Sequence, residues 1–148
     1  MSIGRFDPAD RVIRVYARVE GPAGAFAHVR LIVDTGAAHV VLVPRVADWI
    51  GLGSQRASWP TERIASAHES RAHPRFDLPA LVVLGHRVER VSCVEMELPL
   101  PIGADGLLGN SLLRHFRLDV DFPAGRLTLV RSSGDAMPID PAAGGGAA

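Results

Sequence analysis

Apolar and polar residues alternate along most of this chain, which is the period of β-strands with one buried face. The alternation is clear over residues 11–20. A turn of sequence Gly-Pro-Ala-Gly follows at residues 21–24, and residues 26–33 resume the pattern and end in three apolar residues. Two such runs joined by a turn rich in glycine and proline predict a β-hairpin.

The rest of the chain predicts further short strands and two short helices. The other expected strands are residues 40–43, 58–67, 76–84, 88–96, 107–108, 118–122 and 126–130. Pro44 suits the first turn of a helix and Gly51 its C-terminal cap. Asn110 is an expected N-cap for a second helix that runs to His115. With eleven prolines and fifteen glycines, this pattern predicts a small, closed, all-β domain.

The length of 148 residues is that of one ordinary domain. We expect an N-terminal segment over residues 1–10, a folded domain over residues 11–131 and a disordered tail over residues 132–148. The tail is rich in glycine, alanine and proline, a composition that offers too little apolar surface for folding. The sequence has no internal repeat.

The balance of charges argues against two classes of binding partner. The chain has 16 basic and 16 acidic residues and a formal net charge of zero, which argues against nucleic acid or an anionic membrane as the main partner. Every basic residue is arginine, a bias that we attribute to a GC-rich genome and therefore to a bacterial source.

Location follows from cysteine use and from apolar runs. The single Cys93 excludes an intrachain disulfide and reads as a small buried residue. Residues 1–10 have no apolar run, so we expect no secretory signal peptide. No segment is long and apolar enough for a transmembrane helix, and we therefore expect a cytoplasmic protein.

The strongest chemical signal is Asp34-Thr35-Gly36-Ala37, which follows three apolar strand residues. A carboxylate placed there projects from a rigid apolar surround, where desolvation tunes its protonation. Glycine permits the tight loop that comes next. The pattern alone favours an aspartate that ends a strand and begins a turn, so it does not establish a catalytic role.

A second motif changes that interpretation. Residues 105–113 read Asp-Gly-Leu-Leu-Gly-Asn-Ser-Leu-Leu, and the segment between the two motifs is long enough for a hairpin and its supporting strands. This ordered pair resembles the retropepsin-like aspartic proteases, which include retroviral proteases and bacterial relatives. Residues 116–122 and 125–129 also look like the bacterial members, so the resemblance spans roughly residues 11–130. It implies an acid-protease closed barrel with one lobe per chain.

The resemblance implies an aspartic endopeptidase that works as a homodimer. Such enzymes activate one water between two carboxylates. Two charges about 3 Å apart repel by roughly 5 kcal/mol at an effective dielectric of about 20, so the pair retains one shared proton; the aspartic-protease dyad is itself a standard example of this behaviour. The chain has one such loop, so the second Asp34 would come from a C2-related partner. No cofactor or metal is implied, and the substrate would be a peptide or unfolded protein.

The resemblance also implies roles for the neighbouring residues. Thr35 would hydrogen-bond across the dimer axis, and Gly36 would present its backbone N–H to the carboxylates. Substrate-binding positions would be Ala37, Ala38, Leu107, Leu108 and Gly109. Leu107 and Leu108 would line the substrate channel or the core beneath it, and Gly109 would pack closely behind the active-site loop.

Several positions depart from the family pattern. Retroviral members carry an acidic residue and an arginine that pair with one another, and here these positions are Ala38 and Asn110. His39 and Val40 stand where serine or threonine is common. The expected flap, residues 61–72, has no glycine, although family flaps usually have one at the tip.

Other constellations remain open. Asp119 and Asp121 share one strand face, where a solvated face or hairpin cap is favoured over catalysis. A metal site could use His68, His73 and Glu69, but their spacing matches no compact zinc motif. Asp105 reads as a turn residue. A non-catalytic retropepsin-like dimer that binds peptides or serves assembly is the alternative function.

Overall fold

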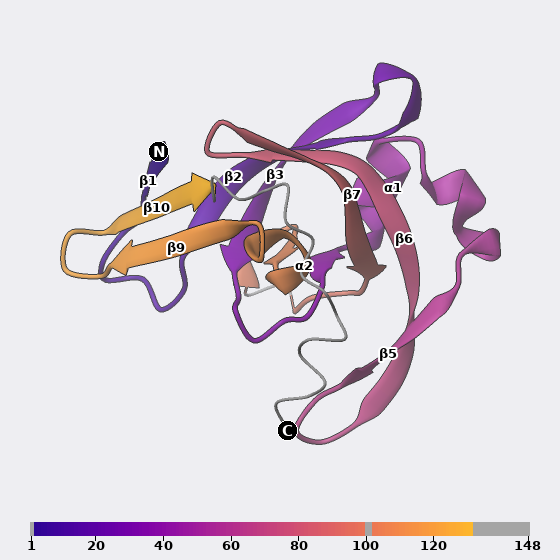
Figure 1. The fold of residues 1–148 in the computed structure, drawn as a ribbon. Helices are drawn as coiled ribbons and strands as arrows, with labels where there is room; N and C mark the ends of the chain where they lie inside the picture. The colour runs from indigo at the N-terminus through magenta and orange to yellow at the C-terminus, as the bar shows by residue number, and fades with distance from the viewer. Residues whose placement is uncertain (1, 100–101, 132–148) are drawn as a thin grey trace, which may run out of the picture.

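The computed structural model describes residues 2–99 and 102–131 (Figure 1). Its helical segments are short: α1 (Pro44–Trp49), α2 (Asn110–Leu113), and the 3₁₀ turns η1 (Pro22–Gly24) and η2 (Gly53–Ser58). The strands are β1 (Ser2–Arg5), β2 (Arg14–Glu20), β3 (Phe26–Val33), β4 (Val40–Leu42), β5 (Thr61–Ala65), β6 (Ser70–Val83), β7 (His86–Glu95), β8 (Gly106–Leu108), β9 (Phe116–Asp121) and β10 (Arg126–Arg131).

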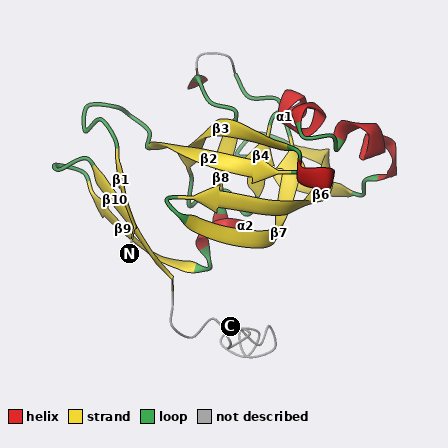
Figure 2. Ribbon diagram, turned by 90° about the horizontal axis from the view of Figure 1, so that it is seen from above, coloured by secondary structure: helices red, strands yellow, loops and turns green. Residues whose placement is uncertain are grey.

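A closed barrel forms the body of the molecule. Its strands are hydrogen-bonded in the order β2-β3-β8-β4-β7-β6, and a further antiparallel pairing of β2 with β6, from Ala17–Val83 to Glu20–Ala80, closes the ring. Figure 2 shows these strands wrapped into one body, with α1 at its right-hand end and α2 near the middle. The predicted closed all-β domain with two short α-helices is confirmed.

The core inside the barrel is aliphatic. Leu31, Leu42, Leu78 and Leu108 are fully buried there, and each such side chain contributes about 1.5–3 kcal/mol relative to exposure. Cys93 belongs to the same cluster, as the sequence predicts, and burial raises the pKa of its thiol. A thiol in this state is unreactive, so Cys93 serves packing.

A second, three-stranded sheet lies beside the barrel in the order β1-β10-β9 (Figure 2). The hairpin of β9 and β10 is predicted by the sequence, but β1 is not. Ser2–Arg5 has no clear alternation and becomes a strand because it pairs with Arg126–Leu129 of β10. The tail predicted over residues 132–148 lies outside the described residues.

The hairpin of β5 and β6 has the position of the expected flap. It runs from the Thr61–Pro74 pair to the Ala65–Ser70 pair and projects from the barrel at the lower right of Figure 1. Its tip has no glycine and is closed by Ser66, whose N–H donates to the carbonyl of Glu69 at 2.7 Å and whose hydroxyl accepts from the N–H of Glu69 at 3.2 Å. A serine turn thus supplies the reversal.

Several predicted boundaries differ from the observed ones, and two of the differences are informative. Asn110 is the first helical residue of α2, and Gly109 occupies the N-cap with extended backbone angles. The strand predicted to begin at Phe76 begins at Ser70, because residues 70–75 pair with β5 although both faces of that hairpin are polar or exposed.

Candidate active site

Asp34 follows directly after β3, in a loop fixed by backbone hydrogen bonds. Its N–H donates to the carbonyl of Leu108 at 3.1 Å, and the N–H of Ala37 donates to the Asp34 carbonyl at 3.2 Å. The N–H of Gly36 donates to the Asp34 carboxylate at 2.9 Å. Asp34 is half-buried, whereas Thr35 and Gly36 are exposed in the single chain. The loop therefore holds one carboxylate in a defined orientation at the surface.

The N-terminal end of α2 holds the same loop from behind. The N–H of Asn110 donates to the carbonyl of Ala37 at 2.8 Å, and that of Ser111 donates to the carbonyl of Ala38 at 2.9 Å. The side-chain amide of Asn110 also donates to the carbonyl of Thr35 at 2.8 Å. Asn110 thus supports the loop directly.

Gly109 packs against the loop as closely as a backbone allows. A Cβ atom at this position would lie 2.0 Å from the carbonyl oxygen of His39 and 2.8 Å from that of Ala37. Real Cβ atoms do not approach other atoms so closely, so only glycine fits without displacing the loop. Gly109 therefore supports the loop from behind, as the resemblance implies, and its predicted contact with substrate stays a prediction.

Ser111 is a supporting residue that the sequence analysis did not identify. Its hydroxyl accepts from the N–H of Val40 at 2.9 Å and donates to the carbonyl of Ser92 at 2.8 Å. These bonds join the end of the active-site loop to β7 across α2. The one sequence signal for this role is that Ser111 stands two residues after Gly109. The sequence does not show which backbone groups the hydroxyl bonds, because these groups are far away along the chain and only the fold brings them close.

Replacing Ser111 by alanine is expected to lower the free energy of unfolding by about 1–3 kcal/mol, because it leaves two partly buried backbone groups without their partner. Denaturant unfolding of the two proteins measures this difference. Ser58→Ala is the matched control, since the Ser58 hydroxyl is exposed and donates only to the nearby Gln55 carbonyl. Equal stability of the two variants would contradict the supporting role.

A cavity of about 340 Å³ lies between the Asp34 loop and the β5–β6 hairpin. Asp34, Gly36, Ala37, Ala38, His39, Val41, Glu62, Arg63, Ile64, Ala65, Met96 and Leu107 line it. Of the two leucines proposed for substrate contact, Leu107 lines this cavity, but Leu108 is fully buried in the core. Adjacent strand residues point to opposite faces, which corrects the assignment of Leu108 as a substrate-binding residue.

Two other carboxylates lie near Asp34, and both are paired with cations. Glu62 lies 3.7 Å from His39 and 3.9 Å from Arg75. Asp10 lines a second cavity of about 500 Å³ that also reaches Asp34, and its hydrogen bond from Arg14 lowers the pKa of the Asp10 carboxyl. Each of these carboxylates already has a positively charged or imidazole partner, whereas Asp34 is bonded to the N–H of Gly36.

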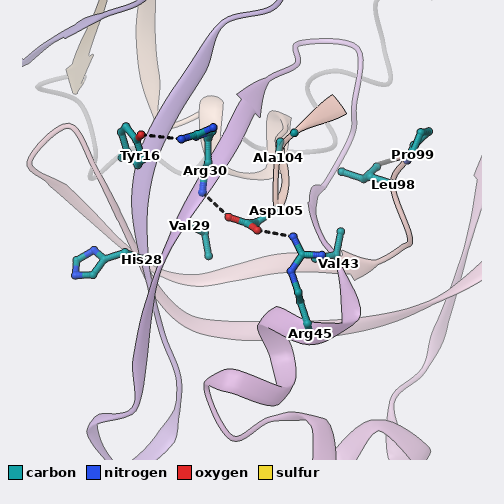
Figure 3. A pocket seen from close by; sticks show the side chains of 11 residues that line it. Tyr16, His28, Val29, Arg30, Val43, Arg45, Leu98, Pro99, Ala104 and Asp105 are labelled. Carbon is teal, nitrogen blue, oxygen red and sulfur yellow. Dashed lines mark hydrogen bonds and ion pairs between the residues drawn. The ribbon is translucent and has the colours of Figure 1, made fainter. Parts of the chain in front are cut away.

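Asp105 does not join this site. Its carboxylate accepts the backbone N–H of Arg30 at 2.8 Å and pairs with the guanidinium of Arg45 at 2.6 Å. Figure 3 shows it between these two arginines, in a separate pocket where the Arg30 side chain also contacts the hydroxyl of Tyr16. Asp105 therefore ties β3 to the start of α1.

Asp121 and Glu69 have local roles. Asp121 accepts the N–H of Ala124 at 3.0 Å and lies 3.4 Å from Arg126, so it caps the β9–β10 turn. Glu69 pairs with Arg71 near the tip of the β5–β6 hairpin. In the described ranges, no three histidine, cysteine or acidic side chains are grouped as a metal would require.

The Asp34 loop, Gly109 behind it and most of the barrel lie in a stretch of the chain that matches a known protein family. Residues 15–112, more than half of the chain, match the family model described as aspartyl protease. The chain belongs to the aspartyl protease family. None of the curated proteins matches it.

The barrel places this aspartyl protease family member among the retropepsin-like folds. A crystal structure of a retropepsin-like aspartic protease from Rickettsia conorii is similar to it with a TM-score of 0.62 and 21% sequence identity. The similarity covers 86% of this chain and 96% of that one. The single lobe is therefore matched almost completely. Within residues 2–99 and 102–131, no helix has the length and hydropathy to cross a bilayer.

Proposed function

We propose that this protease family member is an endopeptidase that works as a homodimer, with one Asp34 from each chain at a C2 axis. The observation that carries the proposal is the isolation of Asp34. The loop exposes Thr35 and Gly36 beside a single oriented carboxylate, while the nearby Glu62 and Asp10 are already paired with arginines. A symmetry mate supplies the missing acid because a C2 axis brings the same residue to both sides.

The proposed reaction follows from two carboxyl groups that share one proton. The ionised Asp34 takes a proton from the water between them as that oxygen attacks the scissile carbonyl. The protonated Asp34 donates its proton to the carbonyl oxygen, which gives a neutral tetrahedral diol. Proton transfer to the amide nitrogen, with return of a diol proton to the dyad, then breaks the C–N bond. The shared proton is restored for the next turnover.

In this proposal, some of the surrounding residues touch the substrate and others hold the Asp34 loop in place. Thr35 would join the two loops across the axis, and the Gly36 N–H would continue to orient the carboxylate. Ala37, Ala38 and Leu107 line the space beside Asp34 and would touch an extended peptide bound as an added strand. Gly109 and Asn110 would hold the loop in place from behind. We propose that the substrate is a peptide or an unfolded segment.

Activity is expected to depend on dimer formation. At enzyme concentrations well below the dimer dissociation constant, the rate of peptide cleavage should rise with about the square of total enzyme, because each active site needs two chains. Initial rates over a wide dilution series measure the exponent, and sedimentation velocity measures the dimer in the same samples. A strictly linear dependence across a range in which the chain is monomeric would contradict the proposal.

The same samples separate catalysis from a non-catalytic role. A dimer that binds peptides without cleaving any member of a mixed library would favour a binding or assembly module instead. A structure of the dimer adds a direct test, because catalysis requires the two Asp34 carboxylates to lie within hydrogen-bond reach of one water.

A further inference from the structure

We propose that His39 is a positioning residue that ties the active-site loop to the flap hairpin through Glu62, and that protonation of His39 strengthens the tie. This inference rests on the proposed endopeptidase function for its kinetic consequence, but the tie itself is a property of the folded chain. It makes closure of the flap over Asp34 sensitive to pH.

The contacts place the His39 ring between the barrel and the flap. Nε2 lies 3.7 Å from a carboxylate oxygen of Glu62 on β5, and Nδ1 lies 3.4 Å from the hydroxyl of Ser92 on β7. The His39 side chain is 20% exposed, so most of the ring is covered. Both His39 and Glu62 line the cavity that contains Asp34.

The backbone around His39 is fixed, so its side chain is the part that can respond. The His39 carbonyl packs against Gly109, and the next N–H, that of Val40, is bonded to Ser111. By contrast, β5 lies at the end of the sheet and pairs with β6 only. An edge strand with one neighbour opens more easily than a strand paired on both sides. The contact therefore joins a loop that is held from several sides to a strand that is paired on one side.

The charges that face this contact define its pH dependence. Glu62 also lies 3.9 Å from Arg75 on β6, and His73 is its cross-strand partner. From the loop side, Asp34 lines the same cavity, as does Arg63 from β5, whose guanidinium donates to the Ser70 carbonyl. An imidazolium at His39 attracts Glu62, whereas a neutral ring does not. The tie is therefore stronger when the ring is protonated and weakens as the pH rises.

The expected effect of the His39–Glu62 pair on flap closure has the size that is usual for a partly exposed ion pair. Glu62 is 39% exposed, and pairs of this kind change an equilibrium by about two- to fivefold. Salt screens such pairs, so the effect should shrink as ionic strength rises. The flap has this bias toward the closed state only while His39 is charged.

Hydrogen–deuterium exchange tests the tie without any substrate. At low ionic strength, and after correction for the intrinsic rate, protection of the β5 segment, residues 61–65, should fall about two- to fivefold between pD 5.5 and 8. In His39→Gln the protection should be low at both values. His73→Gln is the matched control, because it removes a histidine beside Glu62 and leaves the loop contact intact; its pH dependence should match that of the wild type. Retained dependence in His39→Gln, or its loss in His73→Gln, would overturn the inference.

Peptide cleavage gives the second readout. In the wild type, KM should rise about two- to fivefold over the same interval, and this rise should be absent in His39→Gln and in Glu62→Gln, whereas kcat should differ little between the proteins. The double variant should behave as either single variant. If the exchange result holds but no cleavage occurs, the tie stands and the proposed function fails; if cleavage occurs with an unchanged KM profile in His39→Gln, the positioning role fails.

Discussion

Replacing Asp34 by asparagine is expected to lower kcat/KM by a factor of at least about 10⁴ while the fold and the dimer persist. The substitution removes both members of the proposed dyad at once, because symmetry repeats it in the partner, and it leaves no group to take the proton of the attacking water. Asparagine has nearly the same shape, and its amide oxygen still accepts the Gly36 N–H that now binds the carboxylate at 2.9 Å.

Initial rates of peptide cleavage measure this loss, and sedimentation velocity checks the dimer. Asp119→Asn is the matched control, since it removes an acid on β9, opposite Thr128, in the other sheet. Mixed dimers make the test sharper. When equal amounts of the two chains are mixed and allowed to exchange, activity should approach about one quarter of the activity of the same total amount of wild-type chain, because only dimers with two Asp34 residues work. Half the activity would mean that each chain acts alone.

Replacing Gly109 by alanine is expected to destabilise the protein by about 3 kcal/mol or more and to reduce activity by at least about 100-fold. The φ angle of Gly109 is −97°, which any residue adopts, so the cost does not come from the backbone angle. It comes from a Cβ atom placed 2.0 Å from the His39 carbonyl oxygen, which forces the loop or α2 to move. A displacement of about 1 Å at the loop is enough to impair catalysis.

Thermal or denaturant unfolding and peptide cleavage check the two parts of this prediction. Gly24→Ala is the control. Gly24 has a positive φ of 79° but open space around its Cβ position, so alanine there costs only about 1 kcal/mol of backbone strain and should leave activity unchanged. If Gly109→Ala were as stable and active as Gly24→Ala, the close packing behind the loop would not matter for function.

Sequence patterns predict the strands that carry a clear pattern of their own better than the strands that form only by pairing with a distant segment. Strand β3 was predicted with its observed bounds, because Phe26–Val33 ends in apolar residues between two clear turns. Strand β1 was missed because its four residues are organised by β10 and not by their own pattern. The flap hairpin was assigned from the resemblance and lacks a glycine signal, since its reversal depends on the hydroxyl of Ser66.

The candidate site shows the same difference between what local patterns predict and what depends on the fold. Patterns and resemblance identify Asp34 and the glycine-bearing motif near residue 109, and the structure brings the two together. They did not separate Leu107 from Leu108, because which of two adjacent strand residues faces a cavity depends on the register with β3 and β4. They also misplaced Asn110 as a cap, when its side chain instead supports the carbonyl of Thr35.

By itself, the sequence determined the fold class, the position of one candidate catalytic carboxylate in a tight loop, and the need for a partner chain if that carboxylate is to work as one of a pair. These depend on local properties: strand periodicity, loop-forming glycine, and the number of such loops in the chain. Only the tertiary structure decided what holds Asp34 in place. Gly109, Asn110 and Ser111 reach the loop from far along the chain, and such contacts exist only once the barrel has closed and β8 lies against β3.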